Sequence, residues 1–122
     1  EGYLSWYDYI SGYRVQLVSV AQLRDPSAWY HVMIVLDTTQ GTAADRAKIF
    51  LNGTQVTALS TATYPDQDAE CKVNTNTAHH GGRNQQFAAS QNWDGYMAEI
   101  HFVTIVIVKM LDQYHQRRFY EE

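Results

Sequence analysis

The chain has 122 residues, of which 45% are apolar, 13% aromatic and 18% charged, and its formal net charge is −4. This length fits one domain with one core, and the composition excludes a disordered chain. The sequence lacks the stripe of basic residues that would neutralise phosphates, and this excludes nucleic acid as a partner. No apolar run reaches the roughly 18 residues of a membrane span.

The first predicted elements are two strands, Tyr3–Tyr9 and Tyr13–Val20, that form a hairpin around Ser11-Gly12. The next predicted strand is Ala28–Asp37, a dense aromatic and β-branched run after an Asp-Pro turn signal. Because side chains of a strand alternate between its two faces, apolar residues fall on both faces of this run. One face carries Tyr30, Val32, Ile34 and Leu36, and the other carries Trp29, His31, Met33 and Val35. This pattern predicts a central strand that is covered on most of its length.

A second hairpin is predicted within Ala47–Val56, after a loop of small residues at Thr38–Asp45. In this segment Ala47, Ile49 and Leu51 alternate with Lys48, Phe50 and Asn52. The dipeptide Asn52-Gly53 tolerates positive φ at both positions, which a type I′ turn requires. It is the strongest local signal in the sequence.

Two further β segments are predicted downstream. Thr77–Arg83 is a short strand that opens into a polar loop through Asn92. Trp93–Phe102 starts at a turn signal, Asp94-Gly95, and then alternates, with Tyr96, Ala98, Ile100 and Phe102 on one face and Met97, Glu99 and His101 on the other. Strands separated by turn signals favour an all-β antiparallel sandwich.

The last segment departs from the β pattern. In Lys109–Glu122 the residues Leu111, Tyr114, His115 and Arg118 recur at helical spacing. We therefore expect a β-sandwich domain over residues 1–108 and a short helical or extended tail over residues 109–122. Since the chain starts at Glu1 without an initiator Met, we also expect a processed product or part of a longer polypeptide.

Three stretches carry a family resemblance: RDPSAWYHVMIVLDTTQGTAADRAKIFLNGTQV (Arg24–Val56), AHHGGRN (Ala78–Asn84) and WDGYMAEIHF (Trp93–Phe102). Their order resembles the laminin-G-like, concanavalin A-like jelly rolls, especially the branch found in tail fibres and other virion proteins of bacteriophages, marine ones above all. The motifs are specific as a set, and the resemblance covers roughly Leu4 to Phe102. It implies an antiparallel jelly-roll β-sandwich.

The chain departs from this family in two places. Strands that family members carry before the position of Tyr3 are missing, and Val103–Val108 continues as VTIVIV where the family has a polar loop. A jelly roll without its first strands is incomplete and exposes unpaired backbone groups along an edge. We expect either a fragment or an edge covered by another chain, hence an oligomer or edge-paired assembly. VTIVIV suits such pairing as well as it suits an internal strand.

Catalysis is not expected. Glucan-cleaving enzymes of the same superfamily resemble one another in a Glu-x-Asp-x-x-Glu strand, whose carboxylates share one face and act as nucleophile and acid/base. That motif is absent, and the nearest pair, Asp94 and Glu99, has an odd separation that places the two on opposite faces of a regular strand. A glycoside hydrolase-related domain is therefore the weakest of the functions considered.

Metal binding has one candidate set. The adjacent His79 and His80 point to opposite strand faces and cannot readily chelate one ion, so no histidine metal site is expected. The resemblance implies a calcium site at a loop rim, because laminin-G-like domains often bind calcium there through Asp and backbone oxygens. The candidate ligands are Asp37, Asp45 and Asp94. The single cysteine, Cys71, has no activating neighbour in the sequence and is expected to be a small buried or half-exposed thiol.

Glycan binding has its candidate in the loop Gly81–Trp93. Aromatic faces stack on sugars, and amide and guanidinium groups hydrogen-bond to hydroxyls, so a polar loop with aromatic residues is suitable chemistry. The candidate residues are Arg83, Asn84, Gln85, Phe87, Asn92 and Trp93. The alternative is that Trp93 caps the core and the rest is a solvated loop.

Taken together, these features predict a non-enzymatic virion module of a phage, located at the particle surface, with other virion proteins as partners. It acts either as an adhesion module for a host-surface glycan or as a purely structural cementing domain.

Overall fold

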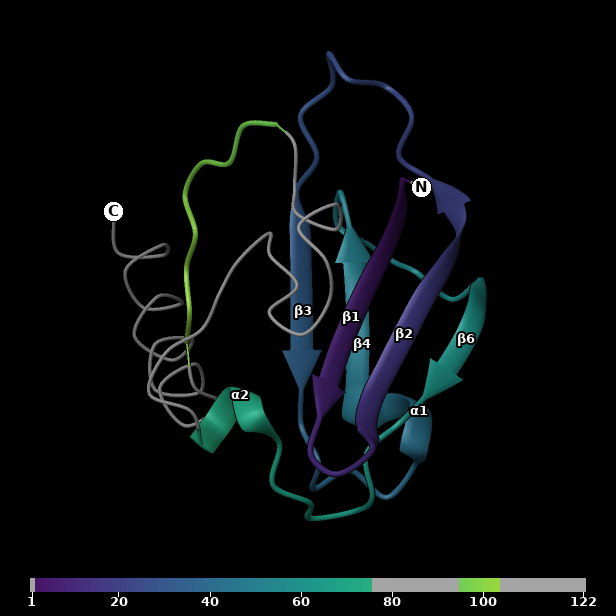
Figure 1. Cartoon of the computed structure of the whole chain (residues 1–122), viewed down its shortest axis with the longest axis vertical. Helices are drawn as coiled ribbons and strands as arrows, with labels where there is room; N and C mark the ends of the chain where they lie inside the picture. Colours follow the sequence, from purple (N-terminus) through teal and green to yellow (C-terminus); the bar gives the residue numbers. More distant parts are fainter. Residues whose placement is uncertain (1, 76–94, 104–122) are drawn as a thin grey trace, which may run out of the picture. The chain divides into compact units, whose positions relative to one another are not determined.

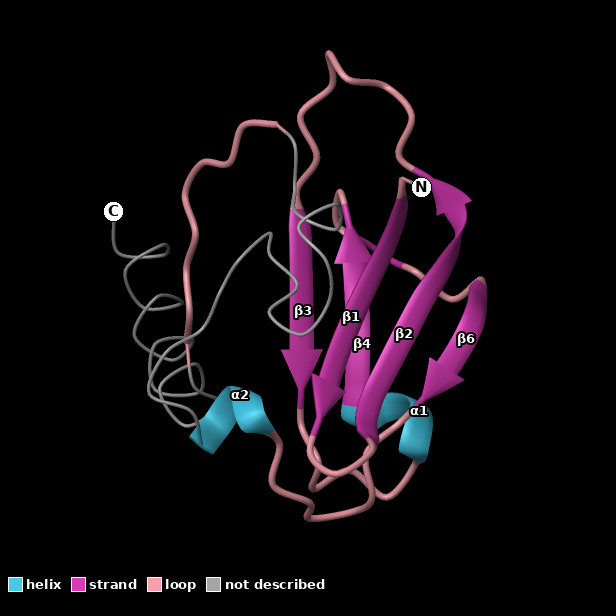
Figure 2. Cartoon of the chain, in the orientation of Figure 1, coloured by secondary structure: helices cyan, strands magenta, loops and turns pink. Residues whose placement is uncertain are grey.

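The computed structural model describes residues 2–75 and 95–103, and the chain divides into two compact units, Glu1–His79 and His80–Glu122. The described residues of the first unit form six strands and two short helices (Figures 1 and 2). Strands β1 (Tyr3–Tyr9), β2 (Tyr13–Gln22) and β6 (Leu59–Thr63) make one antiparallel sheet in the order β1-β2-β6. Strands β3 (Val32–Leu36), β4 (Ala47–Leu51) and β5 (Thr54–Gln55) make the other, in the order β3-β4-β5. The helices are α1 (Ala43–Arg46) and α2 (Lys72–Thr75).

The core of the first unit lies between its two sheets. Val15 and Leu17 of β2 pack with Ala47 and Ile49 of β4, and the cluster also takes in Cys71. The alternation of each strand directs these side chains inward. Partly buried residues surround them: Leu4, Trp6, Leu36, Val56, Leu59, Tyr64 and Val73. Two antiparallel sheets around a shared core confirm the predicted β-sandwich, which is partial within the described residues.

Both predicted hairpins of this unit are confirmed. The β1–β2 turn places Ser11 at φ 47° and Gly12 at φ 146°. In the β4–β5 turn, Asn52 and Gly53 have φ values of 49° and 81°, and the flanking residues Leu51 and Thr54 are paired. Positive φ at both residues of a two-residue loop is the type I′ geometry that the Asn-Gly dipeptide predicts.

The strand predicted over Ala28–Asp37 is shorter than expected, and its predicted central position is wrong within the described residues. Strand β3 begins at Val32, which pairs with Leu51, the last residue of β4. Residues 28–31 extend past that point and therefore have no β4 ladder to join. Since β3 is at one end of its sheet, Val32, Met33 and Ile34 remain 43%, 44% and 48% exposed.

The second unit is described over residues 95–103, and the strand predicted at Trp93–Phe102 is wrong for the part that is described. No strand is formed between residues 95 and 103. Glu99 has a φ of 54°, and a left-handed residue interrupts the alternation that a strand requires. Tyr96, Ile100 and Phe102, predicted to share one face of that strand, are 88%, 69% and 57% exposed.

Several predicted segments lie outside the described residues: the strand Thr77–Arg83, all of Val103–Val108 after its first residue, and the tail at 109–122. The boundary between residues 108 and 109 stays a prediction. Conversely, α1, β6 and α2 were not predicted. Helix α1 overlaps the predicted loop Thr38–Asp45, and LSTAT and KVNT are short segments rich in small and polar residues. Within the described ranges, no helix is long and apolar enough to cross a membrane.

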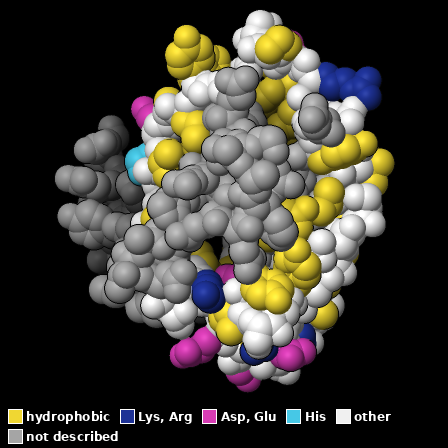
Figure 3. Space-filling model, in the orientation of Figure 1, with side chains coloured by type: hydrophobic (Ala, Val, Ile, Leu, Met, Phe, Trp, Pro, Cys, Tyr) yellow, Lys and Arg dark blue, Asp and Glu magenta, His cyan; other side chains and the backbone are white. Residues whose placement is uncertain are grey.

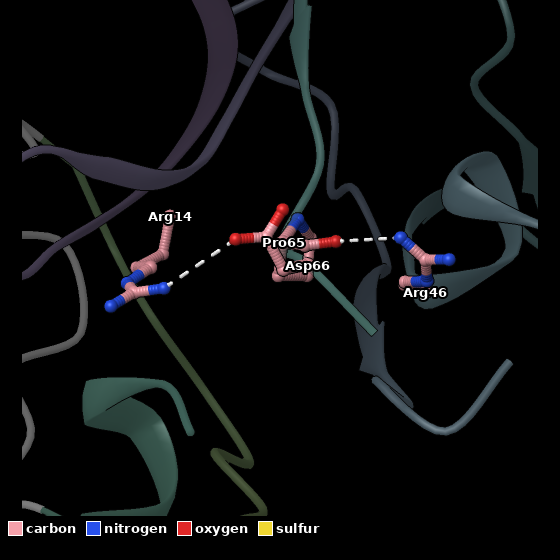
Figure 4. Close-up of polar contacts among 4 residues, drawn as sticks. All are labelled: Arg14, Arg46, Pro65 and Asp66. Carbon is pink, nitrogen blue, oxygen red and sulfur yellow. Dashed lines mark hydrogen bonds and ion pairs between the residues drawn. The ribbon is translucent and has the colours of Figure 1, made fainter. Parts of the chain in front are cut away.

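Two arginines fix the segment that follows β6 (Figure 4). Arg46 donates three hydrogen bonds to backbone carbonyls, from Nε to Gln40 (2.8 Å), from Nη2 to Gly41 (2.8 Å) and from Nη1 to Pro65 (3.1 Å). Arg14 of β2 pairs with Asp66, with 3.9 Å between Nη1 and Oδ2. These contacts tie the β3–β4 loop and the end of β6 to the same edge of the unit.

Candidate functional site

Four tyrosines lie on the outer face of the sheet β1-β2-β6. Alternation along β1 directs Leu4, Trp6 and Asp8 inward and leaves the residues between them exposed. We call the four the tyrosine surface: Tyr3, Tyr7, Tyr9 and Tyr13, which are 49%, 42%, 42% and 39% exposed. In Figure 3 hydrophobic side chains, with tyrosine coloured among them, gather along β2. Solvent-facing aromatic rings that gather on one sheet are unusual on a surface without a binding role.

The ring geometry centres on Tyr13. Its ring centroid lies 5.8 Å from that of Tyr7 at an interplanar angle of 46°, and 5.3 Å from that of Tyr9 at 79°. A register shift between Asp8 and Tyr9 brings Tyr13 opposite Tyr9 instead of the residue that a regular ladder would place there. Tilted and edge-to-face pairs each contribute about 0.5–1.5 kcal/mol beyond area burial, so the three rings hold one another in place before any ligand arrives.

Uncharged polar side chains continue this face across the sheet. Directly opposed residues of an antiparallel pair share a face, and the register therefore gives two rows beside the rings. One row is Tyr7, Gln16 and Thr63, and the other is Ser5, Val18 and Thr61. The hydroxyl and amide groups in these rows can both donate and accept hydrogen bonds. The surface thus combines aromatic rings with neutral hydrogen-bonding groups, which is the chemistry that polyhydroxylated, uncharged ligands require.

Another exposed aromatic residue, Trp29, lies in the loop between β2 and β3. This loop is at the opposite end of the unit from the β1–β2 turn (Figure 1). Trp29 is 69% exposed, and the loop around it is held at both sides. Asp25 accepts hydrogen bonds from the Ser27 hydroxyl (2.6 Å) and amide (2.9 Å), which lower the pKa of its carboxyl. At the other side, the amide of His31 donates to Asn52 Oδ1 (2.9 Å), and the amide of Asn52 donates to the His31 carbonyl (2.8 Å).

The glycan candidates named from the sequence, Arg83, Asn84, Gln85, Phe87, Asn92 and Trp93, all lie outside the described residues, and the site they would form stays a prediction. His79 and His80 lie outside them as well. The tyrosine surface was not recognised from the sequence, although its signal is present. The alternation YLSWYDY places Tyr3, Ser5, Tyr7 and Tyr9 on one face, but which face meets solvent is decided only by the packing of the two sheets.

Two of the three calcium candidates are described, and both carboxylates already have donors. Asp37 Oδ1 accepts from the amide (3.2 Å) and hydroxyl (2.6 Å) of Thr39, and its Oδ2 accepts from Gln40 Nε2 (2.8 Å). Asp45 Oδ1 pairs with Lys48 Nζ at 3.0 Å. Asp94 lies outside the described residues. Across residues 2–75 and 95–103, no three His, Cys, Asp or Glu side chains gather closely enough to hold a metal ion.

The thiol of Cys71 lies in the core beside Asp8. Burial raises the pKa of Cys71, the charge of Asp8 raises it further, and Arg14 acts in the opposite direction. Asp8 is itself 5% exposed: its Oδ2 accepts from the amide of Val73 (3.3 Å), while its Oδ1 has no hydrogen-bond partner in the part of the chain that the structure describes. The carboxylate links β1 to the first turn of α2, and the raised pKa favours the neutral thiol, which is the less nucleophilic form.

Comparison with known protein families gives a match over most of the chain. The model of the Laminin_G_3 family, described as the concanavalin A-like lectin/glucanases superfamily, matches residues 1–108. No curated protein and no solved structure matches the chain. The match covers both sheets of the first unit and the described part of the second.

Proposed function

Because the chain belongs to the concanavalin A-like lectin/glucanases superfamily, we propose that it is a non-catalytic module that binds a neutral carbohydrate on its tyrosine surface. The observation that carries this proposal is the cluster of Tyr7, Tyr9 and Tyr13, in which the Tyr13 ring contacts both others and all three rings stay 39–42% exposed. Sugar rings present apolar C–H faces and a rim of hydroxyls. Aromatic side chains with a polar end offer the complement to both parts.

The neighbouring rows support an extended ligand more than a single terminal sugar. Strands lie about 4.8 Å apart, so the rows from β1 to β6 span about 10 Å of sheet. Across that width Gln16, Thr61 and Thr63 follow the rings with uncharged donors and acceptors. Rows of this length suit an oligosaccharide that lies along the sheet.

Titration of glycans tests the proposal directly. A glycan array identifies ligands for the wild-type chain, and calorimetry then compares variants. Replacing Tyr13 with alanine removes the ring that contacts both others, and we expect the affinity to fall by about tenfold, the equivalent of about 1.4 kcal/mol. Tyr13→Phe keeps the ring and should retain most of the affinity. Trp29→Ala removes a more exposed aromatic group at the other end of the unit, 69% against 39% exposed, and serves as the control.

The same array tests the polar loop, which remains our second proposed binding site. Binding that is lost in Arg83→Ala and Trp93→Ala but kept in Tyr13→Ala would assign the glycan to the loop and overturn the assignment to the tyrosine surface. A folded wild-type chain with no glycan ligand would favour the structural alternative, a domain that holds other proteins together.

The proposal that the module is not an enzyme is supported by the missing Glu-x-Asp-x-x-Glu motif. Glycoside hydrolysis requires two carboxyl groups across the scissile bond. A polysaccharide panel assayed for reducing sugar should give no release. Release that disappears in Glu99→Gln would contradict the proposal.

For its biological setting we propose the surface of a phage particle, where the module attaches to a host glycan or contacts other virion proteins. The support for this is the sequence resemblance of Arg24–Val56, Ala78–Asn84 and Trp93–Phe102 to phage tail-fibre modules. Labelled antibody against the chain, applied to purified particles, should decorate them. Purified particles that the antibody does not decorate would contradict the proposed location on a phage particle. That result would leave the carbohydrate proposal unaffected.

A further inference from the structure

Strand β3 presents an open edge within the described part of the chain. It is the terminal strand of the order β3-β4-β5, and among the described residues it pairs with β4 alone. The hydrogen bonds that flank the strand show which residues face β4: the His31 carbonyl accepts from the Asn52 amide, and the Asp37 amide donates to the Arg46 carbonyl. Because antiparallel ladders alternate, Val32, Ile34 and Leu36 direct their own N–H and C=O groups away from β4.

The strand also lacks the features that normally protect such an edge. Its sequence, VMIVL, has no charged residue and no proline, and its register with β4 has no shift. Val32, Met33 and Ile34 are 43–48% exposed and lie on both faces of the strand. Natural sheets protect free edges with lysine, proline or bulges, and an unprotected apolar edge is a template for another strand.

We propose that the occupant of this edge is a second copy of the same chain, which pairs its own β3 antiparallel about a two-fold axis at Ile34. This register overlaps the two strands completely. It places Ile34 opposite Ile34 and Val32 opposite Leu36, so the outward N–H and C=O groups of each copy meet those of the other. Met33 then lies opposite Val35 on the outer face. Each opposed pair is apolar, and a two-fold interface needs such self-complementarity.

The residues that flank the strand fit the same axis. Continuing the register by one position puts His31 of one copy opposite Asp37 of the other, and the symmetry repeats this pair at the other end. A histidine and a carboxylate are a favourable cross-strand pair, which Asp37 would form beside its bonds from Thr39 and Gln40. Any other antiparallel register would leave part of this five-residue strand unpaired. The pairing joins the two β3-β4-β5 sheets into one continuous sheet across the dimer.

Engineered disulfides test the register. In the proposed dimer the two copies of residue 34 are directly opposed, with Cα atoms about 5.5 Å apart, a separation that a disulfide spans. The two copies of residue 32 are four positions apart along the strand, about 13 Å, which a disulfide cannot span. Oxidised Ile34→Cys should run as a covalent dimer, and Val32→Cys should not. Wild-type protein controls for the native Cys71, which is buried.

Sedimentation velocity tests the dimer without a crosslink. The wild-type chain should dimerise, and Ile34→Lys, which sets two like charges against each other on the axis, should raise the dimer dissociation constant by at least about tenfold. Val20→Lys alters an apolar residue on β2 that is 56% exposed, against 48% for Ile34, and should leave dimerisation unchanged. A wild-type chain that is monomeric at every concentration, as expected if a segment of the same chain occupies the edge, overturns the proposal. Crosslinking of both cysteine variants to the same extent overturns the register.

Discussion

Tyr13 shows how a single irregularity in a ladder can create a surface. A regular continuation from the pair Asp8 and Val15 would place Tyr9 opposite Arg14. The register shift after Asp8 sets Tyr9 opposite Tyr13 instead and brings the Tyr13 ring within 5.3 Å of the Tyr9 ring. Arg14 at that position would have offered the Tyr9 ring no aromatic partner. The chemistry of the surface therefore depends on one extra residue in β2.

Gly53 is required because its backbone φ is positive, and not because a side chain would clash with its neighbours. Its φ is 81°, and a Cβ built there would meet no atom within 4 Å. Gly53→Ala should therefore lower the free energy of unfolding by about 1–2 kcal/mol, the cost of an L-residue in the left-handed region. Chemical denaturation measures it. Gly41 also has open space around it but no positive φ, so Gly41→Ala should be neutral or slightly stabilising. Equal losses in the two variants would contradict this account of the turn.

The thiol of Cys71 makes stability depend on pH in the alkaline range. Its pKa is raised in the folded chain by burial and by Asp8, so the unfolded chain releases this proton first as the pH rises. The contribution of the neutral Cys71 thiol to the free energy of unfolding is fully present below the ordinary thiol pKa. It is lost as the pH rises through the pKa that the thiol has in the folded chain. The denaturant concentration at the midpoint of unfolding should therefore decrease as the pH is raised from about 8 to about 9.5, a range around the ordinary thiol pKa of about 8.5. Cys71→Ala, although less stable at neutral pH, should lose this slope, and an unchanged slope would contradict the assignment.

At the scale of elements, Arg46 holds the β3–β4 loop and the end of β6 through three carbonyls. Arg46→Ala should cost about 1–3 kcal/mol of unfolding free energy, because hydrogen bonds from a charged donor are lost together. Thermal unfolding measures the loss. Arg24→Ala is the matched control: Arg24 is exposed and bonds only locally, from its Nε to Gln22 Oε1. A loss in Arg24→Ala equal to that in Arg46→Ala would show that loop anchoring is not the cause.

The sequence predicts some elements better than others. Elements whose hydrogen bonds are set by nearby turn residues are predicted well, and those that depend on a distant partner strand are not. The two hairpins are predictable because their turn residues determine the connection locally, as Asn52-Gly53 does. The limits of β3 are not, because they depend on where β4 ends at Leu51. Segment 95–103 has a strand pattern in its sequence, but a strand forms only with a partner ladder, and Glu99 adopts a left-handed φ there. The outward-facing tyrosines were predicted as strand residues but not as a site, since solvent exposure is a property of the packed sheets.

On the scale of the whole molecule, the described residues give a partial sandwich with two distinct outer surfaces. The tyrosine surface belongs to the sheet β1-β2-β6, and the open edge belongs to the sheet β3-β4-β5. Because they lie on different sheets, carbohydrate binding and self-association can operate in the same chain. A dimer carries two tyrosine surfaces, and a repeating polysaccharide that reaches both would bind with an avidity above that of one surface.

The tyrosine surface also has a bearing on how the chain folds. All four tyrosines come from β1 and β2, which are neighbours in the chain and joined by a turn of three residues. Hairpins of this kind close in about 1–10 μs, whereas the pairing of β2 with β6 must first close a loop of more than 30 residues. The rings that would contact a ligand can thus assemble among the earliest native contacts, long before the sandwich behind them is complete.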